Sequence, residues 1–190
     1  MPQHHLLTVE QGAKHLQAGG VIAYPTEAVF GLGCDPENEQ AVKTILSLKS
    51  RRQELGLILI SDSFDRLFPF VKPVPDKNLQ TALASWPGPF TWLFPRAENV
   101  PDWLAGDHAS IAIRVSAHPT CRALSAAFGS AVVSTSANPH GSPSATRAEQ
   151  VADYFGTRIE GIVAGEPGQQ AHPSEIRDVM TGALIRGGSS

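Results

Sequence analysis

Basic and hydroxyl side chains recur where apolar segments of this chain end. Thr26 and the run at residues 134–138 (STSAN) each follow a segment that reads as a strand. Lys49 and Arg51 follow an expected helix, and Arg114 lies within an otherwise apolar strand. Ligands of open α/β sheets bind where strand ends and loops converge. Cations and hydroxyl groups gathered there predict an anionic ligand with phosphate and carboxylate groups.

Each of these residues also has a plain structural interpretation. Lys49 and Arg51 would complement the negative end of the preceding helix dipole as solvated charges. Arg114, buried in a strand, needs a partner, which is either a structural carboxylate or a ligand carboxylate held by two nitrogens. The run at 134–138 is also typical of turns and helix caps. Taken one at a time, these residues leave both interpretations open.

Composition narrows the class of protein. The chain has 190 residues with 42% hydrophobic and 17% charged side chains, which fits one folded domain. Its net charge of −3 means that any nucleic-acid contact would need a local basic patch. Cys34 and Cys121 form no metal or redox motif, so we expect two buried free thiols. No signal peptide or membrane-length apolar run is visible, and we expect a soluble cytoplasmic protein without a protein-held metal.

Helical and strand patterns alternate along the whole chain. Expected helices lie at 8–18, 37–48, 118–128 and 146–155, with shorter helical pieces at 62–85 and 100–105. Expected strands lie at 21–24, 57–60, 90–94, 110–115, 131–135, 159–163, 175–179 and 183–186. The glycines at 31–33 predict a tight turn, and residues 139–145 a loop. This alternation predicts one α/β domain over 1–190, with a twisted mixed sheet and flanking helices.

Several linked motifs resemble the YrdC-like family, in its short bacterial form. They are YPTEAVFGLG at 24–33, LKSR at 48–51, WPGPFT at 86–91, IRV at 113–115, STSAN at 134–138 and PSEIRD at 173–178. They occur in the family's order, and the resemblance runs from about residue 8 to 188. P-loop, dinucleotide-binding GxGxxG, HExxH and GxSxG signatures are absent.

The resemblance implies an α/β fold around a large concave, electropositive cavity. It also implies a nucleotidyltransferase reaction, in which L-threonine, bicarbonate and ATP give L-threonylcarbamoyl-AMP and pyrophosphate. That product serves the t6A modification of tRNA, through a transferase complex of TsaD, TsaB and TsaE. Carried over residue by residue, the resemblance makes Lys49 and Arg51 the catalytic phosphate ligands, with Mg²⁺ sharing the charge of ATP. The other expected nucleotide ligands are Ser110, Ser136, Asn138, Ser144 and Arg186, and the expected threonine ligands are Thr26, Arg114, Ser134 and Ser174.

Two positions depart from the family pattern. Arg52 stands where the family usually has proline, and Leu55 stands where a lysine or asparagine is common. One nucleotide contact is therefore either lost or taken over by Arg52 or Gln53. This affects the phosphate-side assignments and not the class of reaction.

A binding module is the main alternative to an enzyme. Such a protein would bind double-stranded RNA or tRNA, in ribosome maturation, and would show salt-dependent affinity without turning over ATP. The cations available for such a patch are Lys43, Lys49, Arg51, Arg52, Arg114 and Arg147. A related domain of hydrogenase-maturation carbamoyltransferases is a second alternative, but it sits in a longer chain with zinc-finger-like cysteines.

Overall fold

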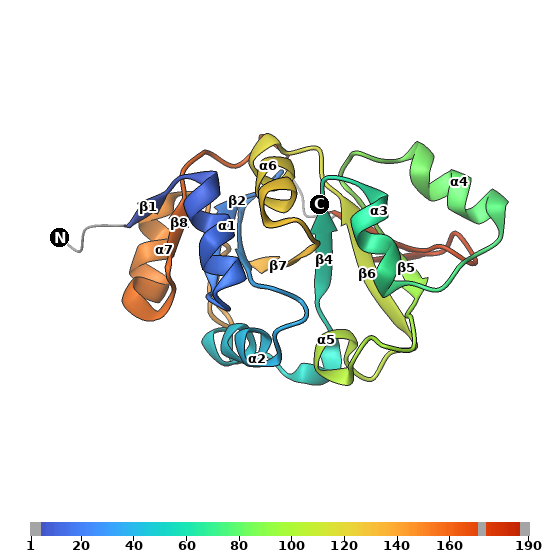
Figure 1. Ribbon diagram of the computed structural model, residues 1–190, viewed down its shortest axis with the longest axis horizontal. Helices are drawn as coiled ribbons and strands as arrows, with labels where there is room; N and C mark the ends of the chain where they lie inside the picture. The colour runs from blue at the N-terminus through green and yellow to red at the C-terminus, as the bar shows by residue number, and fades with distance from the viewer. Residues whose placement is uncertain (1–4, 171–173, 187–190) are drawn as a thin grey trace.

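The strands of this protein join into one mixed sheet of ten (Figure 1). The computed structural model describes residues 5–170 and 174–186. The strands are β1 (Leu6–Leu7), β2 (Ile22–Pro25), β3 (Phe30–Gly33), β4 (Ile58–Ser61), β5 (Phe90–Pro95), β6 (Ser110–Val115), β7 (Val132–Ser136), β8 (Gly161–Val163), β9 (Glu175–Asp178) and β10 (Leu184–Arg186). Their order across the sheet is β1-β8-β2-β3-β7-β4-β6-β5-β9-β10. The sheet contains parallel pairs such as β4 with β6 and antiparallel pairs such as β4 with β7, so the mixed α/β sheet is confirmed.

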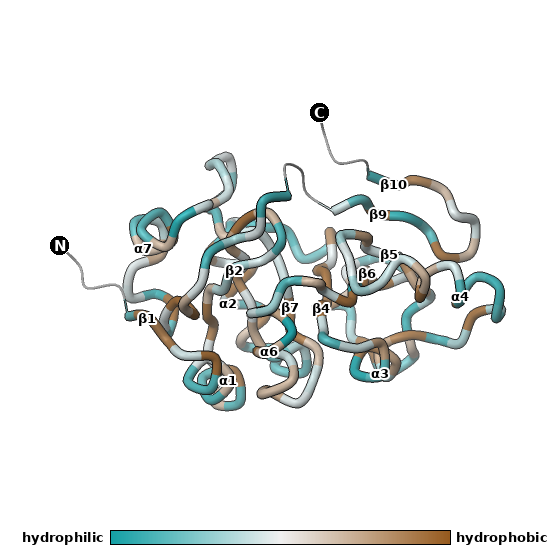
Figure 2. The backbone as a smooth tube through the Cα atoms, turned by 90° about the horizontal axis from the view of Figure 1, so that it is seen from above, coloured by the Kyte–Doolittle hydropathy of each residue, from teal (hydrophilic) through white to brown (hydrophobic). Residues whose placement is uncertain are grey.

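Helices flank this sheet, and some of them begin or end at recognisable caps. They are α1 (Val9–Gln17), α2 (Glu39–Leu48), α3 (Phe64–Leu67), α4 (Asp76–Ala84), α5 (Asp102–Ala105), α6 (Pro119–Phe128) and α7 (Ala148–Phe155), with short 3₁₀ turns at Gln53–Leu55, Phe68–Phe70 and Gly156–Arg158. Thr8 and Gln11 form the expected capping box of α1. Asn38 caps α2, and Gly129 ends α6 in a left-handed conformation. Seen from above, α1, α6 and α3 lie along one side of the molecule, and the β9–β10 hairpin lies on the other (Figure 2).

Two apolar clusters hold the helices to the sheet. The larger contains central strand residues such as Phe30, Leu59 and Ile113, with α2, α5 and α7 packed around them. The smaller joins α1 and α6 to the sheet through residues such as Leu16 and Leu124. All eight residues of β2 and β3 are buried. The central strands are therefore fixed on both faces, which gives a rigid base for the polar side chains that they carry.

The glycines at 31–33 lie in strand β3 and not in the expected turn. Gly33 pairs with Ile22 of β2. A Cβ at Gly33 would lie 2.5 Å from Cε1 of Tyr24 and 2.7 Å from the carbonyl oxygen of Val133. The reason for glycine here is therefore the close approach of the neighbouring strands rather than a backbone turn.

The C-terminal ends of β6 and β7 lie at opposite edges of the sheet. β4 lies between them, parallel to β6 and antiparallel to β7. The polar groups of β6 and β7 therefore do not meet at the ends of parallel strands. Residues 139–145 form a loop as expected, and Oε1 of Gln150 in α7 accepts hydrogen bonds from the Thr146 and Arg147 N–H groups. Within the described residues, no helix is long and apolar enough to cross a membrane.

Candidate functional site

A cavity of about 580 Å³ lies over four neighbouring strands. Its wall includes Gly31 of β3, Ser134 of β7, Ile58 of β4 and Arg114 of β6. Ser134 is the register partner of Ile58, and Arg114 is the partner of Ile60. Because side chains two residues apart on a strand share a face, Ser134 and Arg114 project to the same side of the sheet. The polar groups thus meet over the face of the sheet, although the ends of their strands do not.

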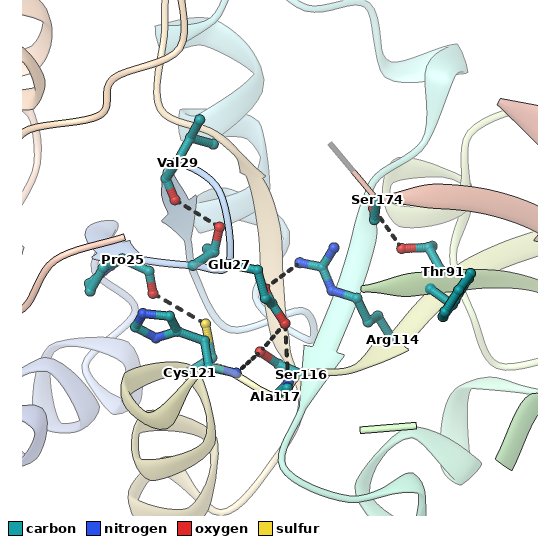
Figure 3. A network of polar contacts seen from close by, with 12 residues as sticks. Pro25, Glu27, Val29, Thr91, Arg114, Ser116, Ala117, Cys121 and Ser174 are labelled. Carbon is teal, nitrogen blue, oxygen red and sulfur yellow. Dashed lines mark hydrogen bonds and ion pairs between the residues drawn. The ribbon is translucent and has the colours of Figure 1, made fainter. Parts of the chain in front are cut away.

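Arg114 forms an ion pair with Glu27 in the wall of this cavity (Figure 3). Nη2 of Arg114 lies 3.4 Å from Oε2 of Glu27, and both side chains are almost buried. Nε of Arg114 and Oε2 of Glu27 have no hydrogen-bond partner within the described chain. Figure 3 shows the guanidinium between Glu27 and the Thr91–Ser174 pair. The structural and the ligand-binding interpretations of Arg114 are therefore compatible, because its carboxylate partner leaves guanidinium N–H groups available.

Glu27 is itself fixed by the turn that follows β6. Its Oε1 accepts hydrogen bonds from Oγ of Ser116 at 2.7 Å and from the Ala117 N–H at 3.1 Å. Burial raises the pKa of Glu27, but the Arg114 charge and these hydrogen bonds outweigh it, so the pKa lies below its ordinary value. Glu27 is thus an ionised carboxylate at neutral pH that holds Arg114 in place.

Hydroxyl groups complete this end of the cavity. Thr26, Ser134 and Ser174 all line it and are all buried. Oγ1 of Thr26 donates to the Val29 carbonyl at 2.7 Å, and Oγ of Ser174 lies 3.0 Å from Oγ1 of Thr91. The structure therefore brings together the four residues expected to bind threonine, namely Thr26, Arg114, Ser134 and Ser174.

Lys49 is hydrogen-bonded to the end of β7 and to the loop that follows it. Its Nζ donates to the Ser136 carbonyl at 2.5 Å and to the Asn138 carbonyl at 2.8 Å. The residue is only 6% exposed, so it is not the solvated helix-end charge of the structural alternative. Burial, and then the positive charge of Arg51, lower the pKa of Lys49 to about 8. Lys49 therefore joins the loop to α2 while adding positive charge beneath it.

Arg51 and Arg186 bring two positive charges close together in a second part of the first cavity. Both line it, and Nη2 of Arg51 donates to the Gly56 carbonyl at 3.0 Å. Burial, and then the charge of Arg186, lower the pKa of Arg51 from its ordinary value. Nε of Arg51 is buried without a hydrogen-bond partner in the described part of the chain. The Arg51 side chain lines the cavity and is suited to an anion there, which would supply the opposing charge.

A second cavity, of about 540 Å³, shares Arg51 and Ser136 with the first. Lys49, Arg52, Asn138 and His140 also line it. Leu55 lies in its wall as well, but Gln53 does not. Of the two residues that could compensate for Leu55, Arg52 is therefore the one that faces this space.

The residues expected on the nucleotide side are distributed over these two cavities, with one exception. Ser144 and Arg186 line the first, Lys49 and Asn138 the second, and Arg51 and Ser136 both. Ser110 lines neither, because it begins β6, four residues and about 13 Å along the strand from Arg114. Its role in nucleotide binding stays a prediction.

The basic patch expected for an RNA-binding module does not form one exposed surface. Lys49 and Arg114 are 6% and 8% exposed, and Lys43 forms an ion pair with Glu39 on the outside of α2. Two of the six cations are therefore out of reach of a polymer backbone.

The role of Glu27 was not predicted from the sequence. The signal was the buried position of Arg114, which requires a carboxylate partner, but nothing in the sequence says which carboxylate. Cys34 and Cys121 are buried free thiols as expected, and burial raises the pKa of Cys121 to about 12. Within the described residues, no group of three or more His, Cys, Asp or Glu side chains could hold a metal ion.

Comparison with known proteins places this fold and cavity in a family. A family model described as "Telomere recombination" (Sua5/YciO/YrdC) matches residues 14–188. A protein of Halorhodospira halophila named threonylcarbamoyl-AMP synthase is 47% identical over 178 residues, covering 94% of this chain and 93% of that protein. A protein of the same name from Marinobacter nauticus is 51% identical over 170 residues, covering 89% of this chain and 90% of that protein.

Solved structures agree with this assignment. The crystal structure of E. coli YciO has a TM-score of 0.84 at 25% identity and covers 96% of this chain and 89% of that one. The structure of P. abyssi Sua5 complexed with L-threonine has a TM-score of 0.84 at 34% identity, over 90% of this chain. This chain spans half the length of that Sua5 protein. The chain therefore belongs to the Sua5/YciO/YrdC family.

Proposed function

We propose that this protein is a threonylcarbamoyl-AMP synthase, which forms L-threonylcarbamoyl-AMP and pyrophosphate from L-threonine, bicarbonate and ATP. Relatives of nearly the same length carry this name, and a Sua5 relative has been solved with L-threonine. The observation that carries the proposal is the two-part cavity. One end has a buried arginine among hydroxyl groups, and the other has closely spaced cations without a carboxylate partner in the described part of the chain.

Threonine binds at the Arg114 end of the first cavity. The guanidinium of Arg114 takes the α-carboxylate, because arginine can present two N–H groups to two carboxylate oxygens. Thr26, Ser134 and Ser174 offer hydroxyl groups to the rest of the amino acid. The amine of threonine then forms a bond to the carbon of bicarbonate, water is lost, and a carbamate results.

The carbamate next attacks ATP. One carbamate oxygen forms a bond to the α-phosphorus, the bond from that phosphorus to the bridging oxygen breaks, and pyrophosphate leaves. This transfer of an adenylyl group makes the enzyme a nucleotidyltransferase. No protein nucleophile is required, so the protein contributes positioning and neutralisation of charge. Lys49, Arg51 and Arg186 supply the positive charge, while Ser136, Asn138 and Ser144 offer polar groups to the nucleotide.

Mg²⁺ enters this reaction with the triphosphate. Magnesium is commonly held by substrate phosphates and water with few protein ligands. It would share the charge of the phosphate oxygens with Lys49 and Arg51. The product is a reactive mixed anhydride, which we propose is consumed by a TsaD, TsaB and TsaE transferase complex in the t6A modification of tRNA.

Pyrophosphate release by the purified protein tests the proposal. The assay contains ATP and Mg²⁺, with threonine and bicarbonate each present or omitted. Release that requires both substrates supports the synthase, and serine in place of threonine measures specificity. Release that is independent of threonine, or absent in every combination, contradicts it. Salt-dependent RNA affinity without turnover would favour the RNA-binding module instead.

A further inference from the structure

The charged side chains that line the second cavity are all basic, whereas those of the first cavity include a carboxylate. Lys49, Arg51 and Arg52 lie in the wall of the second cavity together with His140, and no aspartate or glutamate is among its lining residues. The first cavity, by contrast, contains the carboxylate of Glu27 next to Arg114. A hollow with cations alone is suited to a ligand that carries several negative charges and no positive one.

Lys49, Arg51 and Arg52 also have no carboxylate partner elsewhere among the described residues. Across residues 5–170 and 174–186, no carboxylate oxygen lies within 4.0 Å of the basic nitrogens of Lys49, Arg51 or Arg52. Lys43, on the neighbouring helix α2, pairs with Glu39 at 2.8 Å. Lys49, Arg51 and Arg52 thus lie together in the wall of one cavity without a compensating carboxylate among the described residues.

The backbone after α2 directs these side chains to the cavity. Ser50 has a positive φ of 48°, and the Arg51 N–H donates to the Leu46 carbonyl at 2.9 Å. This left-handed ending reverses the chain, so that Lys49 and Arg52 lie in the wall of one cavity. Lys49 already donates to the Ser136 and Asn138 carbonyls. Arg52 and His140 are exposed at this cavity and form no ion pair within the described residues.

The two cavities meet at Arg51 and Ser136, which line both. In the proposed reaction, one substrate must extend from the acceptor amino acid to a polyphosphate tail. The bond that breaks lies between the α-phosphorus and that tail. A junction lined by a cation is a suitable place for the α-phosphate, with the amino acid on one side and the leaving group on the other.

We propose that Arg52 and His140, which also line the second cavity, are ligands of the pyrophosphate leaving group in addition to the expected phosphate ligands Lys49 and Arg51. This inference rests on the proposed synthase activity for its biological meaning. The second cavity has a volume of about 540 Å³, which lies within the usual range for small-molecule sites. Pyrophosphate carries several negative charges on its terminal oxygens, which suits a cavity lined by three cations. Arg52 and His140 then act on the product of the reaction and not on threonine.

Binding of inorganic pyrophosphate to the full chain tests this, measured by calorimetry without ATP, threonine or bicarbonate. We expect Arg52→Gln and His140→Gln each to weaken binding, by about 10-fold for the arginine, as for loss of one charge-assisted hydrogen bond. Lys43→Gln is the matched control, because Lys43 is an exposed cation nearby that faces no cavity. It should leave the affinity within about twofold, as expected for a surface charge. Since Arg52 and His140 are exposed, these variants should also keep the melting temperature.

Three results distinguish this inference from the proposed function. Pyrophosphate that does not bind, or binds equally to wild type, Arg52→Gln and His140→Gln, overturns the inference. Binding that depends on Arg52, together with no threonine-dependent turnover, keeps the anion site and refutes the synthase. In an active enzyme, we expect Arg52→Gln to raise the pyrophosphate inhibition constant while the threonine KM stays unchanged. An unchanged inhibition constant there contradicts the inference.

Discussion

Arg114 and Glu27 form an ion pair in the wall of the first cavity that leaves part of the guanidinium unpaired. Nη2 of Arg114 is 3.4 Å from Oε2 of Glu27, a distance longer than a hydrogen bond. Oε1 of Glu27 is occupied by Ser116 and Ala117, whereas Nε of Arg114 has no partner in the described structure. Glu27 thus orients the guanidinium without using all of its donors. Arg114 lines the cavity, so a substrate carboxylate bound there would complete the site.

Replacing Arg114 should therefore affect threonine far more than ATP. Arg114→Lys keeps a positive charge beside Glu27 but loses the planar pair of donors. We expect the threonine KM to rise about 10-fold or more, while the ATP KM changes by less than about twofold. Steady-state kinetics with each substrate varied in turn measures both values. Arg114→Ala should show a larger effect in the same direction, since it also leaves a buried carboxylate unpaired. Equal effects on both KM values would contradict the assignment.

Glu27 should act on threonine through Arg114, as a positioning residue. Glu27→Gln keeps an oxygen for Ser116 and Ala117 but removes the charge, so the guanidinium is less well held. We expect a several-fold higher threonine KM with an unchanged ATP KM. A lower threonine KM would instead mean that Glu27 competes with the substrate for Arg114.

Glu27→Gln should also change how the stability of the fold depends on pH. The folded-state pKa of Glu27 is below its ordinary value, so ionised Glu27 stabilises the fold above about pH 4.3. That contribution is lost as pH falls through the folded-state pKa. Urea unfolding of wild type and Glu27→Gln across this range should show a weaker pH dependence in the variant. Parallel curves would indicate that the carboxylate is not stabilised by folding.

Lys49 should make polyphosphate binding sensitive to pH. Its pKa of about 8 means that the free protein loses this charge in mildly alkaline solution. A bound anion favours the charged form, so affinity should fall as pH rises above about 8. The measurement is the dissociation constant of ATP or pyrophosphate from pH 7 to 9.5. Binding avoids the titration of the threonine amine, which would affect turnover in the same range.

Arg51 provides the control for this titration. Repulsion from Arg51 is the second cause of the low pKa of Lys49, after burial. Arg51→Gln should weaken binding overall but move the alkaline fall in affinity to higher pH. Lys49→Met should remove the fall altogether. An alkaline fall that persists in Lys49→Met belongs to another group.

The sequence predicts most of the fold because the apolar patterns of its elements are strong. Expected helices and strands agree with those observed from α1 to β10, with ends that shift by one or two residues. The exception is Gly31 to Gly33, because glycine in a turn and glycine at a close strand contact look alike in a sequence. The direction of β6 and β7 could not be predicted, since strand order depends on long-range packing.

The residues expected from the sequence do line the two cavities, with the exception of Ser110, but their contacts could not be predicted. Arg114, Ser134 and the other threonine-side residues are carried by motifs that are recognised by their order along the chain, since no single motif is specific. The partners of Arg114 and Lys49 are distant in sequence, and one of them is a set of backbone carbonyls. Carbonyl oxygens are present at every residue, so no residue type identifies such a partner.

Gly31 and Gly33 provide a matched pair for separating cavity shape from stability. A Cβ at Gly31 would lie 3.3 Å from Cγ2 of Thr26 and 3.6 Å from Oγ of Ser134, both in the cavity wall. A Cβ at Gly33 would instead collide with backbone, at 2.7 Å from the Val133 carbonyl oxygen. Both changes add one methyl group to the same strand, but only the first adds it where threonine is proposed to bind.

Gly31→Ala should therefore raise the threonine KM several-fold and lower the free energy of unfolding by less than about 1 kcal/mol, since its contacts are close to ordinary ones. Gly33→Ala should destabilise the protein by about 2–4 kcal/mol, because the rigid backbone of β7 cannot yield as a side chain can. Urea unfolding and threonine kinetics on both variants separate the two effects. Should Gly31→Ala leave the threonine KM unchanged, the amino acid does not lie between Thr26 and Ser134, and the Arg114 end of the cavity is not its site.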